Sequence, residues 1–310
     1  YHAANIPREM MLVPLVLSLL AISAAKAGPV EIMSFWDGNP EDMKGWTNTA
    51  FTDSASDLAG YHAANIQVLW KVEGDFFTGS PRALRSDWQA AWNSTLAFAQ
   101  PAFANGTIVG FFLGDENVWN GLPPASLDVA AQAVRAAFPS AIIWTNEAIF
   151  PVIDGSDRFG TKHNYTHLST GLTHFSVDFY HMSSGEFVDD VRQLYQKAVY
   201  PKMAKGQKAL LVPGSFASTH NPSCNVSCYD TFCARDAYEF YKWAQEDDLV
   251  AGIAPWHWTR CGGCVQYQDE IGTQSLNVTK AAWQAIGRDI ISKLDAGRRG
   301  RIAENRPNFL

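Results

Sequence analysis

The chain has 310 residues, of which 47% are hydrophobic and 13% aromatic, and its formal net charge is -7. This length supplies one large core and lies within the usual range of a single α/β barrel, so no second domain is required. The acidic balance excludes the broad basic surface of a nucleic-acid-binding protein. The one concentration of basic residues, Arg298 to Arg301, indicates a solvated C-terminal tail over residues 297–310.

The first residues have the features of a secretory signal. Arg8 precedes an apolar run, Met10 to Ala25, that ends in small residues. A basic flank, an apolar centre and a small-residue exit are typical of a cleaved signal, and the run is short for a membrane span. We therefore assign residues 1–27 to a signal peptide and expect a secreted protein with no membrane contact after cleavage. The hexapeptide at residues 1–6 recurs at 61–66, so the extension before Met10 is a doubtful N-terminus.

Sequons and cysteines agree with secretion. In an oxidising compartment we expect two disulfides and one remaining thiol, either as local bridges or with a bridge that joins the 224–233 group to Cys261 or Cys264. The Cys261-x-x-Cys264 spacing leaves a zinc site as the alternative. The potential N-glycosylation sites are Asn93, Asn105, Asn164, Asn225 and Asn277, and the cysteines are Cys224, Cys228, Cys233, Cys261 and Cys264.

Eight runs of strand length follow one another along the chain, most of them separated by stretches of helical periodicity. The expected strands cover residues 31–36, 46–51, 67–72, 107–113, 141–145, 174–180, 208–212 and 250–258. The expected helices cover residues 55–64, 82–104, 123–138, 187–203, 235–245 and 276–294. The first strand is not followed by the G-x-G-x-x-G of a dinucleotide-binding, doubly wound sheet. The alternation therefore predicts the α/β class and a single (β/α)₈ TIM barrel over residues 28–296.

Acidic residues gather at the carboxyl ends of the expected strands, which form the catalytic face of such a barrel. Asp115 and Glu116 close the fourth strand, Glu147 follows the fifth, and Asp178 lies within the sixth. Like charges in one cleft push one pKa upward, as a general acid at neutral pH requires. Glycoside hydrolysis needs one protonated and one ionised carboxyl group in a single pocket. These four acids are therefore the candidate catalytic residues.

Aromatic and polar residues accompany the acids at the same strand ends. Tryptophan rings stack on the C–H faces of sugars, which points to a carbohydrate partner. We expect no cofactor and no metal in this site, and a monomeric protein. The candidate substrate-binding residues are Trp36, Asp37, Trp144, Asn146, Tyr180, His181, Trp256 and Trp258.

Four short motifs resemble those of (β/α)₈-barrel glycoside hydrolases, and the resemblance covers most of residues 29–294. They are Gly114-Asp115-Glu116, Asn146-Glu147, Asp178-Phe179-Tyr180 and Trp256-His257-Trp258. In the commonest retaining group of that superfamily the nucleophile is a glutamate on strand seven. This chain departs from the pattern, because its seventh strand ends in Pro213-Gly214-Ser215-Phe216 without an acid.

Chitinase-like barrels are more similar in part. They have a catalytic glutamate on strand four, an aspartate and a tyrosine on strand six and a tryptophan on strand eight, and the resemblance carries these roles to Glu116, Asp178, Tyr180 and Trp256. The D-x-D-x-E run of that family is absent, because Gly114 stands two residues before Glu116.

The sequence thus predicts a secreted glycosidase that acts on a polysaccharide or glycan. Glu116 is the expected general acid, its ionised partner is Asp178 or Glu147, Asp115 tunes its charge, and Tyr180 positions the substrate. Acids two strands apart favour the wider carboxyl separation of inverting enzymes, so we favour Asp178 over Glu147 unless the substrate supplies its own nucleophile. The alternative function is a non-catalytic, lectin-like carbohydrate-binding barrel, which the missing acid on strand seven favours.

Overall fold

The computed structural model describes residues 30–178, 180, 187–218, 224–259 and 270–304. The expected signal peptide lies outside these residues, as do His181, Cys261, Cys264 and the chain after residue 304. Within the described part of the chain, no helix has the length and apolar character needed to cross a membrane.

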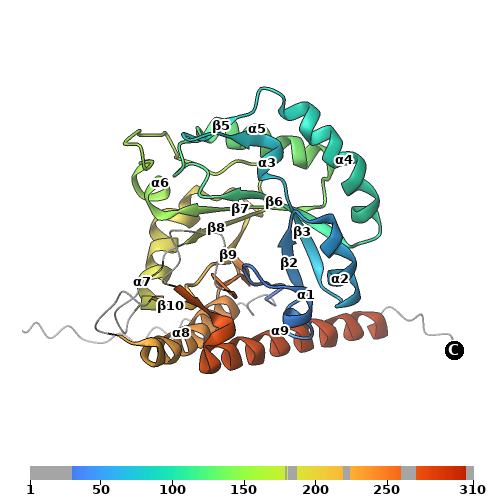
Figure 1. Ribbon diagram of the computed structural model, residues 1–310, viewed down its shortest axis with the longest axis vertical. Coiled ribbons are helices and arrows are strands. Elements are labelled where there is room, and N and C mark those ends of the chain that lie inside the picture. Colours follow the sequence, from blue (N-terminus) through green and yellow to red (C-terminus); the bar gives the residue numbers. More distant parts are fainter. Residues whose placement is uncertain (1–29, 179, 181–186, 219–223, 260–269, 305–310) are drawn as a thin grey trace, which may run out of the picture.

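Eight parallel strands form a nearly closed barrel (Figure 1). They are β1 (Ile32–Met33), β2 (Thr49–Thr52), β3 (Gln67–Lys71), β6 (Ile108–Asp115), β7 (Ile142–Ala148), β8 (His174–Asp178), β9 (Lys208–Leu211) and β11 (Val250–Ile253). Neighbours in the barrel follow chain order, and the first strand pairs with the last, so that Ile32 lies opposite Gly252. The predicted (β/α)₈ fold is confirmed.

The seam between β1 and β2 is closed by a side chain. Asn48, just before β2, donates its backbone N–H to the Met33 carbonyl at 3.1 Å. Its side-chain Oδ1 accepts the Met33 N–H at 2.9 Å, and its Nδ2 donates to the Glu31 carbonyl at 2.8 Å. One asparagine therefore supplies the hydrogen bonds that a longer strand pair would make.

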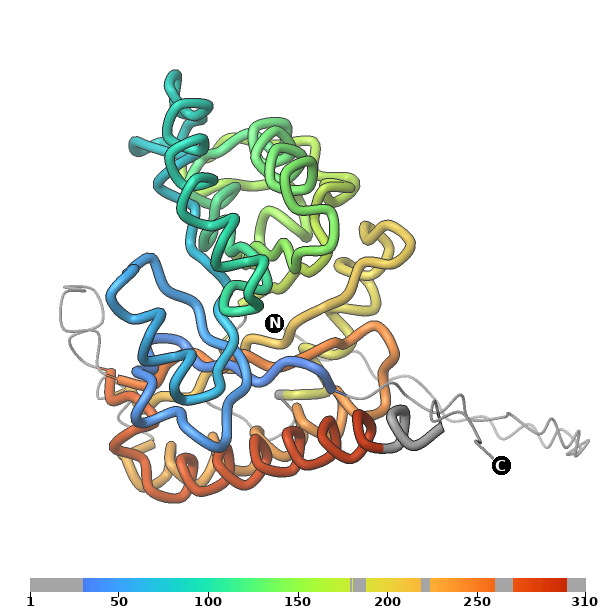
Figure 2. Tube along the Cα trace, turned by 90° about the vertical axis from the view of Figure 1, so that its right-hand side faces the viewer, coloured from blue at the N-terminus to red at the C-terminus, as the bar shows by residue number. Residues whose placement is uncertain are grey.

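Helices surround the barrel. The principal ones are α2 (Leu58–Ala63), α4 (Trp88–Ala104), α5 (Pro124–Ala137), α7 (Phe187–Leu194), α8 (Val226–Glu246) and α9 (Asn277–Glu304), and short ones are α1 (Pro40–Met43), α3 (Glu73–Phe76) and α6 (Ile149–Asp154). A π-helical segment, Tyr195–Val199, accompanies them, with 3₁₀ turns at Ala55–Asp57, Tyr200–Lys202 and Thr273–Ser275. Two-stranded ribbons pair β4 (Phe77–Thr78) with β5 (Ala83–Leu84) and β10 (Phe216–Ser218) with β12 (Glu270–Gly272). Figures 1 and 2 show α8 and α9 side by side along one edge of the molecule.

Several element boundaries differ from those that the sequence predicts, among them the following three. The helix expected from residue 82 begins at Trp88, because residues 73–84 form α3 and the β4–β5 ribbon instead. The cysteine-containing segment begins α8 at Val226, well before residue 235. Helix α9 continues to Glu304, past residue 297, where the sequence predicts a tail.

The core has two layers, which the alternation of strand residues separates. In β7, Trp144 belongs to the cluster inside the barrel, whereas Ile143 packs between the barrel and its helices. The interior cluster consists of Ile32, Trp36, Phe51, Leu69, Phe112, Trp144, Leu210, Val212, Ala251 and Ala254. The centre of the barrel is thus filled with apolar side chains, so the polar side chains of the barrel interior lie toward its ends.

Candidate active site

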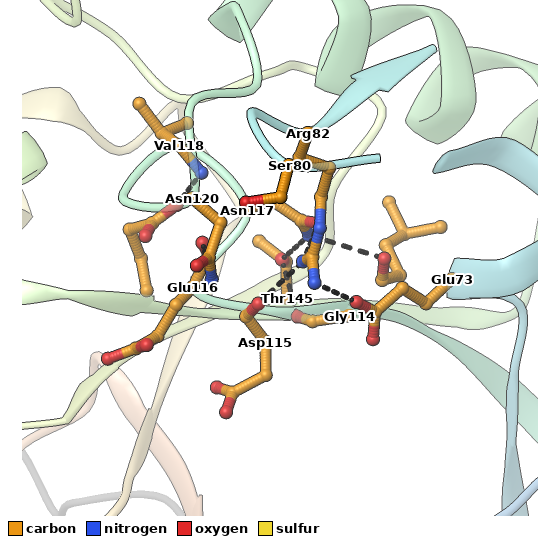
Figure 3. A network of polar contacts seen from close by, with 12 residues as sticks. Glu73, Ser80, Arg82, Gly114, Asp115, Glu116, Asn117, Val118, Asn120 and Thr145 are labelled. Carbon is orange, nitrogen blue, oxygen red and sulfur yellow. Dashed lines mark hydrogen bonds and ion pairs between the residues drawn. The ribbon is translucent and has the colours of Figure 1, made fainter. Parts of the chain in front are cut away.

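The fourth barrel strand, β6, ends in an irregular backbone that turns two acids in different directions. Its pairing with β7 shifts register between Phe112 and Asp115, Gly114 has φ of 122°, and Glu116 has φ of 49°. A Cβ on residue 114 would lie 2.8 Å from the carboxyl carbon of Glu73, so only glycine fits there. Figure 3 shows the Asp115 and Glu116 side chains diverging from this bend, both on the side away from Arg82.

Arg82 holds the bend in place (Figure 3). Its guanidinium lies 2.6 Å from a Glu73 carboxylate oxygen, and it donates at 2.8 Å to both the Asp115 carbonyl and the Asn117 side-chain oxygen. Both charged partners are largely buried, so the pair is screened less than a surface ion pair. The sequence does not predict this role, because it places Arg82 in a helix and not in the β4–β5 ribbon.

Asp115 is oriented by a chain of hydrogen bonds inside the barrel. Asn146 Nδ2 donates to Asp115 Oδ1 at 2.8 Å, Ser176 Oγ donates to Asn146 Oδ1 at 2.6 Å, and Trp144 Nε1 donates to Ser176 Oγ at 2.8 Å. Burial, followed by the charge of Glu116, raises the pKa of Asp115 to about 7. Asn146 thus lies where the sequence places it, in the site, and it presents an amide hydrogen to an acid.

Glu116, directly after β6, and Asp178, the last residue of β8, lie close enough for their carboxyl groups to influence each other's pKa, although these strands are two apart in the barrel. Burial raises the pKa of Glu116, and the charges of Arg158 and Arg82 oppose this rise. Burial and the neighbouring carboxylates raise the pKa of Asp178 well above its ordinary value. Two carboxyl groups this close favour a state with one proton between them, because both cannot ionise at low cost. Their closeness also differs from the wider separation of an inverting pair that the sequence predicts for acids two strands apart.

The sequence predicts that Glu147 begins a loop after the fifth strand. In the structure Glu147 lies within that strand, β7. Because Asn146 faces the barrel interior, Glu147 faces the opposite side of the sheet, and it is completely buried there. Its carboxylate accepts the backbone N–H groups of Val118 at 2.7 Å, Trp119 at 3.1 Å and Ala148 at 3.0 Å. Burial raises the pKa of Glu147 to about 8, against the effect of these hydrogen bonds. The structure therefore does not bring Glu147 together with the carboxyl pair of Glu116 and Asp178.

The predicted stacking residues divide into two groups. Trp36, Trp144 and Trp258 are 4%, 0% and 2% exposed, and Trp258 Nε1 donates to Asp42 at 3.0 Å. This burial contradicts the sugar-stacking role predicted for these three tryptophans. Trp256 and Tyr180 retain exposed surface beside the interior cluster, whereas Asp37 is exposed at the end of β1.

A cavity of about 600 Å³ opens at the carboxyl end of β3, and the candidate catalytic acids are not among its lining residues. Asp53, Lys71, Glu73 and Arg82 line it, together with β4. The cavity also has apolar rings in its lining, those of Trp70 and Phe77. It reaches the acids only indirectly, through Arg82, which contacts both Glu73 and the Asp115 carbonyl. Among the described residues, no cluster of three or more histidine, cysteine, aspartate or glutamate side chains is arranged to hold a metal ion.

No protein-family model and no curated protein matches the sequence. Solved structures do share the fold. A glucosidase from Croceicoccus marinus is 12% identical with a TM-score of 0.53, over 86% of this chain and 68% of that one. A xylanase from Thermoanaerobacterium saccharolyticum is 7% identical with a TM-score of 0.51, over 81% and 95% of the two chains. A β-galacturonidase from Eisenbergiella tayi is 11% identical with a TM-score of 0.51, and the match spans 83% of this chain but 51% of that enzyme.

The chain has a (β/α)₈ barrel fold, which these solved glycoside hydrolases share. In this barrel the acids described above lie at the carboxyl ends of the strands, the face on which active sites of such barrels are built. At these identities the likeness concerns the fold, and the chemistry has to be argued from the residues themselves.

One local disulfide is present among the described residues. Cys224 and Cys228 are bonded at the start of α8, where the Asn225 side chain caps the helix by accepting the Cys228 N–H. Cys233 has a free thiol, and burial raises its pKa to about 12. The Cys224–Cys228 bond is a local bridge within the 224–233 group, one of the two arrangements that the sequence predicts. The other predicted disulfide partners, Cys261 and Cys264, lie outside the described residues.

Proposed function

We propose that the protein is a glycosidase that hydrolyses a glycosidic bond in a polysaccharide or glycan, with Glu116 as the general acid and Asp178 as its partner. The observation that carries the proposal is the closeness of these two half-buried carboxyl groups at the carboxyl ends of strands four and six of the barrel, where each is influenced by the other. A pair that shares one proton supplies both an acid and a base, which the cleavage of a glycosidic bond requires.

The surrounding residues have separate parts in this proposal. Asp115, fixed by Asn146, adds negative charge beside Glu116 and helps to keep a proton in the cluster near neutral pH. Tyr180 and Trp256 border the mouth of the barrel and would contact the sugar. In the reaction, the proton held by the pair is passed through Glu116 to the leaving oxygen, and Asp178, ionised once this proton has left, accepts a proton from the attacking water.

Replacement of Glu116 tests the proposal. Glu116→Gln keeps the shape of the side chain but cannot donate its proton, so turnover should fall about 10²- to 10⁴-fold while the fold is retained. Glu41→Gln, an exposed acid on α1, is the matched control and should leave turnover unchanged. Undiminished turnover by Glu116→Gln would overturn the assignment of the acid.

The configuration of the first-formed product tests the partner. Inversion requires about 6.5–9.5 Å between the two carboxyl groups, so Asp178 has to move away from Glu116 to admit the water. Proton NMR of the fresh anomer should show inversion if Asp178 then activates this water. Retention confined to acetamido sugars would mean that the substrate supplies the nucleophile. Retention on other sugars would require a second carboxylate nucleophile. The sequence assigns that role to Glu147, but Glu147 faces the other side of the sheet, so Asp115 is the acid that remains beside Glu116.

A carbohydrate-binding barrel without catalysis is the second candidate, and the end of β9 is the observation that favours it. Ser215 stands there, completely buried, and forms a hydrogen bond with Thr273, so this strand contributes no acid to the site. A panel of glycans screened for both binding and cleavage separates the two functions. Binding without cleavage of any bound glycan would favour the lectin.

We also propose that the protein is secreted and N-glycosylated. The apolar segment at residues 10–25 supports secretion, and the asparagines of all five sequons are exposed. Treatment with peptide N-glycosidase should lower the mass of the protein expressed in a eukaryotic secretory system. An unchanged mass would refute the glycosylation.

A further inference from the structure

Exposed apolar side chains are concentrated at one place on the rim of the barrel. Phe150, Ile153 and Phe159 are 54%, 55% and 44% exposed, and all three come from α6 and the segment that follows it. The half-buried indole of Trp119 stacks on the Phe150 ring, with ring centres 5.4 Å apart and planes 28° apart. We call Trp119, Phe150, Ile153 and Phe159 the rim platform. Large exposed aromatic groups next to a polar cleft mark a binding surface.

The rim platform is connected directly to the proposed acid. The Glu116 carbonyl accepts two hydrogen bonds from Asn120, from its backbone N–H and from its side chain, both at 2.8 Å. Trp119 lies within this turn. Its carbonyl accepts the backbone N–H of Arg158 at 3.0 Å, and the charge of Arg158 acts on Glu116. The platform is therefore the immediate continuation of the backbone turn that carries Glu116.

The buried carboxylate of Glu147 connects the backbone segments that carry the two stacked rings. It binds the N–H groups of Val118 and Trp119 on one side and that of Ala148, at the start of α6, on the other. Trp119 and Phe150 are thus fixed relative to each other before any ligand arrives, which reduces the entropy lost on binding. This arrangement gives Glu147 a structural task outside the carboxyl pair.

Polar groups flank the platform on the side of the cleft. The Arg158 guanidinium lies 5.0 Å from the centre of the Phe159 ring and donates to Ser80 Oγ at 3.3 Å. An aromatic face with hydrogen-bonding groups beside it suits a sugar, which presents C–H groups on its faces and hydroxyls at its edge. A purely apolar ligand would leave the guanidinium unused.

We propose that Trp119 and Phe150 bind the sugar unit on the leaving-group side of the cleaved bond. This rests on the proposed function, because the platform lies outward from Glu116, whereas Asp115, Asn146 and Asp178 lie toward the barrel axis and would hold the other sugar. The substrate class is therefore an oligosaccharide or polysaccharide, and a monosaccharide glycoside with a small leaving group misses part of the site.

Binding to a catalytically silent protein tests the platform separately from catalysis. In a Glu116→Gln background, titration calorimetry with cellotetraose, xylotetraose and tetra-N-acetylchitotetraose should identify a ligand. Phe150→Ala and Trp119→Ala should weaken its binding about three- to tenfold, the loss of roughly one aromatic contact. Phe150→Tyr should retain the affinity, because it keeps the ring. Tyr238→Ala, which removes a 52% exposed ring from α8, is the matched control and should have no effect.

Kinetics with the active enzyme give the second measurement. Phe150→Ala should lower kcat/KM on the tetrasaccharide by the same factor but leave hydrolysis of the corresponding glycosyl fluoride unchanged, because fluoride does not reach the platform. Unchanged tetrasaccharide binding, equal losses with Tyr238→Ala, or binding of none of the three tetrasaccharides would overturn the inference. Binding that depends on Phe150 without hydrolysis by the wild type would reject the glycosidase function and support the platform as a sugar-binding site.

Discussion

Removal of the Glu147 side chain is expected to destabilise the protein strongly. Glu147→Ala leaves the N–H groups of Val118, Trp119 and Ala148 without their acceptor in a region where Glu147 itself is completely buried. Each unsatisfied buried donor costs about 1–3 kcal/mol. Because water can enter the space of the deleted side chain and satisfy part of this need, we expect a total loss of about 3–5 kcal/mol in the free energy of unfolding.

Urea denaturation followed by tryptophan fluorescence measures this loss as a lower midpoint at an unchanged slope. Glu147→Gln keeps one acceptor oxygen and should cost less than Glu147→Ala. The control is Glu246→Ala, whose partner Arg192 lies 3.1 Å away in an exposed ion pair, with an expected cost below about 1 kcal/mol. A loss by Glu147→Ala no larger than that of the control would refute the reasoning. A Glu147→Gln protein that is stable, binds glycans and has no turnover would instead assign Glu147 to the chemistry.

Three further outcomes follow from the structure. Gly114→Ala should lower stability by about 1–3 kcal/mol more than Gly106→Ala in the same urea assay, because only the first Cβ meets a neighbour, the Glu73 carboxyl group, although both glycines have positive φ; equal losses would show that the close approach is unimportant. The pKa of Asp115 is raised from 3.8 to about 7 in the folded protein, so folding favours the protonated carboxyl group. The stability that protonated Asp115 contributes is therefore present below pH 4 and is lost as the pH rises to about 7. Asp115→Asn should therefore gain stability relative to the wild type between pH 4 and pH 8, and a difference that does not change with pH would contradict this sign. Reduction of the Cys224–Cys228 disulfide, whose cysteines are four residues apart, should cost about 2 kcal/mol, and peptide mapping that finds both thiols free in the native protein would contradict the bridge.

The fold was accessible from the sequence because barrel strands are buried on both faces and appear as continuous apolar runs. The run before Asp115 and Glu116 is an example: from Phe111 to Gly114 every residue is buried in β6. The structure of residues 73–84 is harder to predict from the sequence, because its elements are four residues long or shorter. Elements this short show no helical or strand periodicity of hydrophobic residues. Arg82 was consequently assigned to a helix, and its contacts with Glu73 and Asp115 were missed.

The site was predicted in part for a related reason. Its acids stand at strand ends, which a sequence reveals, but the face on which a side chain lies depends on where the strand stops. Strand β7 continues through Ala148, and the alternation that places Trp144 and Asn146 inside the barrel places Glu147 outside it. A strand taken to residue 148 would have shown this. Phe150 and Trp119 gave no signal, because they lie in a six-residue helix and an irregular turn.

The pairing of β1 with β11 has a consequence for the order of folding. Residues 32 and 33 pair with residues 252 and 253. The first strand to be synthesised, β1, therefore cannot form these hydrogen bonds until the last strand, β11, has been synthesised. Until then β1 is attached to its other neighbour through the side chain and backbone of Asn48. Contacts that span most of a chain make folding slow, and a partly folded barrel exposes unpaired strand edges in the meantime. Closure of the barrel is therefore a late, whole-chain event, and a chain truncated before residue 250 would leave both β1 and β9 as open edges.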